Sequence, residues 1–176
     1  MHKETGWDQI DTGAKQFYVD HVSDGYTKRG DFYINPKGEE VFAYTRRNFW
    51  DRNTSSLSFS KAAFGSKTKL GFIMAHDLGH STLNLYPSLL NLRYDKTTTG
   101  YESSRIPGTG SPGISVDHAA IWGLENDFMI KNGLKSLPGV FDNSIRMQGI
   151  FNTYILNNVT YKQLYEKIKH LSVKIK

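Results

Sequence analysis

The 176-residue sequence contains no cysteine. This absence excludes disulfide bonds, thiolate zinc sites, iron–sulfur clusters and a cysteine nucleophile. Any metal ion held by this chain must therefore be bound by histidine nitrogen, by carboxylate oxygen or by backbone oxygen. The sequence has 6 histidines, so a cluster among them is the first feature to look for.

Long hydrophobic runs are also missing. The longest, from Leu70 to Ala75, is far shorter than the roughly 20 apolar residues that cross a bilayer. The N-terminal residues are polar and lack the apolar core of a cleavable signal peptide. We therefore expect no membrane partner. The protein is expected to be an effector secreted or delivered without such a signal, a cytoplasmic protein, or a fragment of a longer chain.

The charge balance gives no clear partner. The formal net charge is +5, and the composition of 38% apolar and 22% charged residues is typical of a soluble globular domain. The basic residues are scattered, apart from one dense run in residues 162–176. No RNA-recognition, zinc-finger or helix-turn-helix signature accompanies them, so we do not expect a nucleic-acid partner.

The length favours one domain, which we predict over residues 1–176 with an α+β fold. Residues 31–35 (DFYIN) and 40–46 (EVFAYTR) predict a hairpin around a Pro-Gly turn, and residues 57–59 predict a short third strand. In chain order, the predicted parts are a polar, turn-rich segment (1–30), the strands (31–60), a helix that carries the candidate metal site (66–86), a long loop without regular structure (93–114) and a helical part (115–176).

Polar residues and glycine mark the ends of the predicted helices. Ser66 or Thr68 can cap the first helix, in which apolar residues recur at helical spacing to about residue 85. Ser115 can cap the second helix, and Gly133 ends it. A final amphipathic helix is predicted from about Thr160, and we expect it to pack against the rest of the domain.

The candidate chemistry lies in the sequence His76-Asp77-Leu78-Gly79-His80, within the most apolar helix. Histidines at positions i and i+4 lie on one helix face, one turn apart, so both imidazoles can reach one cation. Zinc binds neutral imidazole and needs no thiolate. Asp77 can act as a general base toward water activated by the metal, which is the logic of the H-E-x-x-H helix. Gly79 would let a neighbouring element come close to this helix.

A third ligand must come from a downstream element. The helix predicted after residue 115 offers Asp117, His118 and Glu125. A carboxylate at Asp117 in the first turn also simply stabilises a helix N-terminus. His118 and Glu125 share one face about two turns apart, so only one of them can reach the same metal. The residues alone leave the choice of third ligand open.

Residues 59–133 resemble the zincin-type metallopeptidase domains of RHS-repeat and other polymorphic bacterial toxins. The resemblance is carried by SFSKAAFGSKTKLGFIMAHDLGHS and by VDHAAIWGLENDFMIKNGL. It implies a zincin-like fold and a Zn²⁺ ion held by His76, His80 and Asp117, with Asp77 as the catalytic base. It also implies a protein or peptide substrate and an immunity or inhibitor protein as partner. At both acidic positions this chain has Asp where the family pattern has Glu.

Two other interpretations remain open. His-Asp followed by Leu-Gly-His is similar to the HD phosphohydrolases, whose adjacent His and Asp both bind metal and whose substrate is a phosphate ester. That resemblance implies an all-helical fold and would add His21 and Asp117 as ligands. Alternatively, the cluster belongs to a catalytically inactive metal-binding or interaction module, which the missing Glu favours. Our working hypothesis is a zinc-dependent hydrolase that cleaves an amide bond.

Overall fold

The computed structural model describes residues 11–19, 22, 25–48, 50–51, 53–86, 89, 93–95, 100–102, 116–135 and 159–175. Within these ranges the fold is mixed α and β, as the α+β prediction requires. The strands are β1 (Lys15–Val19), β2 (Thr27–Arg29), β3 (Phe32–Ile34), β4 (Glu40–Val41), β5 (Ala43–Arg47), β6 (Thr54–Phe59), β7 (Arg93–Asp95) and β8 (Gly100–Glu102). The helices are α2 (Lys67–Leu83), α4 (Val116–Lys131) and α6 (Val159–Ile168), with short 3-10 helices η1 (Lys61–Gly65) and η2 (Lys169–Leu171).

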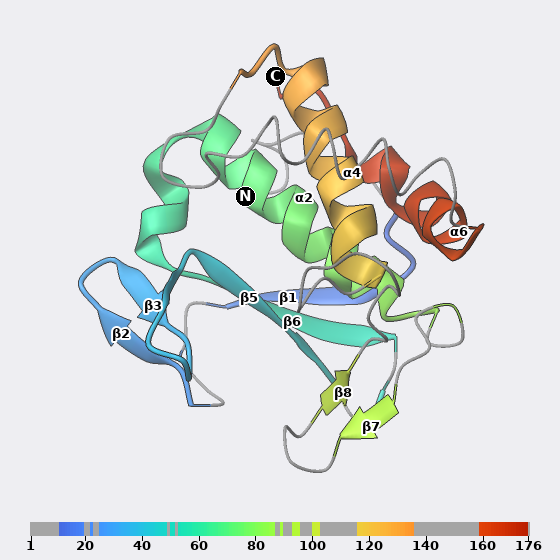
Figure 1. Cartoon of the computed structure of the whole chain (residues 1–176). Coiled ribbons are helices and arrows are strands. Elements are labelled where there is room, and N and C mark those ends of the chain that lie inside the picture. The colour runs from blue at the N-terminus through green and yellow to red at the C-terminus, as the bar shows by residue number, and fades with distance from the viewer. Residues whose placement is uncertain are drawn as a thin grey trace.

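The strands form three small sheets. In the first, of order β1-β6-β5, β1 runs parallel and β5 antiparallel to the central strand β6. In the second, of order β2-β3-β4, neighbouring strands are antiparallel, and β7 pairs with β8 alone. Figure 1 shows α2, α4 and α6 gathered on one side of the β1-β6-β5 sheet.

One hydrophobic cluster joins this sheet to the three helices. Leu57 and Phe59 of β6 belong to the same buried cluster as the apolar residues of α2. Phe72 of α2 and Phe128 of α4 meet edge to face, with ring centroids 6.0 Å apart. The predicted packing of the final helix is confirmed, because its apolar residues enter the same cluster.

The described helices include none that is both long and apolar enough to span a bilayer.

The predicted hairpin is confirmed in its first half and wrong in its second. β3 and β4 pair antiparallel around the expected turn. The chain then bends at Phe42, so residues 43–47 form a separate strand, β5, that pairs with β6 instead. β6 also begins at Thr54, three residues before the predicted strand. A continuous run of β-forming residues does not show in sequence where a bend divides it between two sheets.

Two other predicted boundaries are wrong because strand pairing outweighed local composition. Residues 1–30, predicted as polar and turn-rich, contain β1 and β2. The first of these pairs with β6, whose partner residues lie about 40 positions away, a contact that local patterns do not reveal. Residues 93–114, predicted as a loop without regular structure, contain the β7–β8 pair. Pro, Gly and Ser favour loops, but each of these two strands has a central tyrosine, which is a strand former.

The predicted helix ends are confirmed where the structure describes them. The Ser66 side chain accepts a hydrogen bond from the backbone N–H of Lys69, and α2 begins directly after it. Gly133 follows the end of α4 with a φ of 64°, the left-handed conformation expected of a helix stop. The predicted cap at Ser115 lies outside the described residues.

Removing the cap of α2 gives a simple test of this helix. We expect Ser66→Ala to lower the free energy of unfolding by about 1 kcal/mol, because the Lys69 N–H loses its acceptor. Ser66→Asp keeps an acceptor at the same position and is expected to retain wild-type stability. Urea denaturation of the three proteins measures the difference. Equal midpoints for the wild type and the alanine variant would show that the cap contributes nothing.

Candidate metal centre

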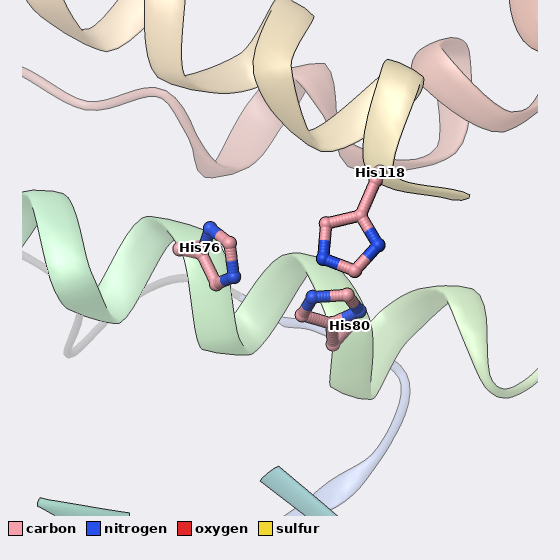
Figure 2. A group of neighbouring side chains, drawn as sticks. All are labelled: His76, His80 and His118. Carbon is pink, nitrogen blue, oxygen red and sulfur yellow. The ribbon is translucent and has the colours of Figure 1, made fainter. Parts of the chain in front are cut away.

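Three histidines from two helices face one another (Figure 2). His76 and His80 lie one turn apart on α2, and His118 comes from the first turn of α4. One nitrogen from each ring lies within 4.8 Å of the other two. The His80 ring centroid is 4.8 Å from that of His76 and 4.8 Å from that of His118. Because the chain has no cysteine, a histidine cluster was the first kind of metal site to look for, and these three residues form one.

The donor set fits a small divalent cation. Three imidazoles are a common zinc ligand set, and tetrahedral coordination places ligand nitrogens roughly 3.3 Å apart. The nitrogens of the cluster already lie within 4.8 Å of one another, and changes of side-chain rotamer can shorten these distances. All three histidines are half-buried. A catalytic zinc site has three protein ligands and keeps its fourth position open, whereas a structural site has four protein ligands.

Gly79 sets how closely α4 approaches the metal-site helix. A Cβ atom there would lie 3.2 Å from Leu124 and 3.3 Å from Ile121, both on α4. The predicted close approach at this glycine is therefore confirmed. Because α4 packs directly onto this part of α2, its first turn places His118 beside His80.

Glu125 contacts a histidine of the cluster without joining the cluster itself. Its Oε1 lies 2.6 Å from Nδ1 of His76, and its side chain is fully buried. The sequence offers Glu125 and His118 as alternatives to Asp117 for the third ligand. The structure brings His118 to the two helix histidines and places Glu125 behind one of them.

Asp77 is buried on the side of α2 that faces the sheet. Its Oδ1 accepts a hydrogen bond of 2.7 Å from the hydroxyl of Thr45 on β5. Burial raises the pKa of this carboxyl, and the neighbouring imidazole of His76 partly offsets that effect. Among the residues that the structure describes, Asp77 is not a member of the metal-binding group.

The remaining predicted site residues are only partly described. Asp117 belongs to the first turn of α4, but its side chain lies outside what the structure describes, as does all of His21. Thr45 was missed by sequence reasoning. It lies 32 residues before Asp77 on an ordinary strand, and no sequence pattern marked it.

Comparison of the chain with protein-family models, with curated proteins and with solved structures finds no match. The geometry of the three histidines and of the two buried carboxylates is therefore the basis for any functional proposal.

Proposed function

We propose that this chain is a zinc-dependent hydrolase that binds one Zn²⁺ through His76, His80 and His118. The observation that carries the proposal is the convergence of three half-buried histidine nitrogens within 4.8 Å. When bound, zinc supplies a Lewis acid that makes water more acidic and polarises a carbonyl group. We assign the third ligand place to His118 in preference to Asp117, the ligand that the toxin resemblance implies, because the ring nitrogen of His118 belongs to the cluster.

Asp77 is the proposed general base. Its carboxylate follows His76 directly in the helix, and Thr45 holds one of its oxygens in place. A general base works best when its pKa is close to the operating pH. Burial raises the pKa of Asp77 in that direction. The second carboxylate oxygen can accept a proton while the first remains bonded to the Thr45 hydroxyl.

The resemblance to toxin zincins supports the finer parts of the proposal. These are a zincin-like fold, a protein or peptide substrate cleaved at an amide bond, and an immunity or inhibitor protein as partner. They also include delivery as an effector. The mixed fold agrees with a zincin-like arrangement in one respect, since a sheet lies against the helix that carries both histidines of the motif.

The phosphohydrolase alternative gains no support from these contacts. It implies an all-helical fold, whereas the described residues include three sheets. It also needs Asp77 as a metal ligand, yet among the described residues Asp77 does not belong to the metal-binding group. We therefore propose amide-bond hydrolysis, and the substrate test below separates it from the alternative.

Metal removal tests this proposal directly. We expect the purified protein to contain about one zinc per chain and to lose activity on a peptide library after chelation, with recovery when Zn²⁺ is added back. Zinc at 100 times its dissociation constant is expected to stabilise the fold by about 2.7 kcal/mol, measured by thermal unfolding. Hydrolysis of phosphate esters without peptide cleavage would favour the phosphohydrolase. Zinc binding without any hydrolysis would favour an inactive module.

A further inference from the structure

A fully buried carboxylate lies behind the metal cluster. The side chain of Glu125 is 0% exposed, in the middle of α4 between the buried residues Leu124 and Phe128. Burial of a carboxylate in such surroundings is costly unless a partner compensates its charge. The one partner the structure gives it is Nδ1 of His76, at 2.6 Å, and its Oε2 atom has no hydrogen-bond partner among the described residues.

This contact determines which nitrogen of His76 can bind a metal. A carboxylate in its ionised form only accepts hydrogen bonds, so with that form of Glu125 the Nδ1–H of His76 is the donor in this contact. The lone pair of the neutral ring then belongs to Nε2. The same contact fixes the ring plane and makes the imidazole a stronger electron donor. A carboxylate behind a ligand imidazole also offsets part of the charge of a bound cation.

We propose that Glu125 is a positioning residue for the metal centre, which holds His76 in the tautomer and orientation that bind Zn²⁺. This inference rests on the proposed function, since it assumes that His76 is a ligand. It replaces the earlier alternative in which Glu125 was itself a ligand. The buried carboxylate is expected to lower the stability of the metal-free protein and to raise the stability of the metal-bound protein.

The test compares zinc and cobalt binding by the wild type and three variants. Glu125→Gln keeps the size of the side chain and one acceptor oxygen but removes the charge. Glu125→Asp keeps the charge but shortens the side chain. Glu166→Gln is the matched control, because it removes an exposed carboxylate on α6 that forms a surface ion pair with Lys169. Zinc dissociation constants are measured by chelator competition, and the ligand field by the visible spectrum of the Co²⁺ form.

We expect Glu125→Gln to weaken zinc binding about 10- to 100-fold, as loss of such outer partners does elsewhere. The Co²⁺ spectrum is expected to shift, Glu125→Asp to fall between the wild type and Glu125→Gln, and Glu166→Gln to match the wild type. Without metal, Glu125→Gln is expected to melt at or above the wild-type temperature. Saturating zinc is expected to restore most of its peptidase activity, because Glu125 acts through metal binding.

Three contradicting outcomes can be told apart. If the wild type itself binds neither zinc nor cobalt, the proposed function fails and the role of Glu125 fails with it. If the wild type binds zinc and Glu125→Gln binds it equally well, with an unchanged Co²⁺ spectrum, the metal site stands and the positioning role is wrong. A Glu125→Gln protein that is less stable without metal and has normal zinc affinity would assign Glu125 a purely structural role.

Discussion

Replacing His118 with alanine is expected to weaken zinc binding by more than about 100-fold. Loss of an outer partner alone costs about 10- to 100-fold, and His118 supplies one of three direct ligands in the proposed site. The centroid of its ring lies 4.8 Å from that of His80, and its nitrogen belongs to a group of three histidine nitrogens from α2 and α4. Two histidines on a single helix would leave the ion with too few protein ligands for tight binding.

Two control variants make this expectation specific. Asp117→Asn removes the ligand that the toxin resemblance favours and is expected to keep zinc affinity within a few-fold of the wild type. His170→Ala removes an exposed histidine in η2, whose ring contacts the backbone of Asp11, and is expected to have no effect. Calorimetric titration with Zn²⁺ measures all three proteins. Loss of binding in Asp117→Asn and normal binding in His118→Ala would reverse the ligand assignment.

Asp77→Asn is expected to lower peptidase activity by about 10²- to 10⁴-fold, the usual contribution of a general base. The asparagine amide keeps an oxygen that can accept from the Thr45 hydroxyl, so the local packing is preserved. It cannot accept a proton as the carboxylate does. Zinc affinity is expected to stay within a few-fold, because Asp77 is not a member of the metal-binding group in the described part of the chain.

Asp77→Asn is also expected to change how the free energy of unfolding depends on pH. Burial raises the pKa of Asp77 in the folded chain above its unfolded value. The stability that this group contributes is therefore fully present below the unfolded pKa and is lost as pH rises through the folded pKa. In metal-free protein, Asp77→Asn is expected to be more stable than the wild type at neutral pH, with the difference shrinking in acid. Urea denaturation of the two proteins at neutral and at acidic pH measures this difference in the free energy of unfolding.

Two outcomes would remove Asp77 from its proposed role. An Asp77→Asn protein that cleaves peptides at the wild-type rate would show that another group accepts the proton. Loss of zinc from this variant would instead make Asp77 a ligand, as in the phosphohydrolase interpretation. Asp77→Glu supplies a positive comparison, since a general base in the H-E-x-x-H pattern is expected to retain or gain activity with the longer carboxylate.

The helices and the two motif histidines were predictable because their signals are local. Ser66 caps α2, apolar residues recur along it, and a spacing of four residues places His76 and His80 on one face. Gly79 predicted the close helix contact for the same reason, since a glycine inside an apolar helix has few other uses. Each of these inferences needs only neighbouring residues.

The rest of the site depends on contacts between distant residues. Thr45 meets Asp77 only because β5 turns away from β4 and joins β6, and the sequence does not mark that bend. Glu125 was predicted as one of several possible ligands, but its contact with His76 depends on how α4 crosses α2. Helix periodicity fixes which residues share a face, whereas the packing of two helices decides which of them touch.

The most direct test of the three-histidine site is a crystal structure of the zinc-loaded protein with anomalous data collected at the zinc edge. The expected result is a single ion bonded to one nitrogen each of His76, His80 and His118, at about 2.0–2.1 Å. The ring of His76 is expected to keep its Nδ1 contact with Glu125. An ion bound elsewhere, one held by Asp117 or Asp77 in place of His118, or no ion in zinc-soaked crystals would contradict this site.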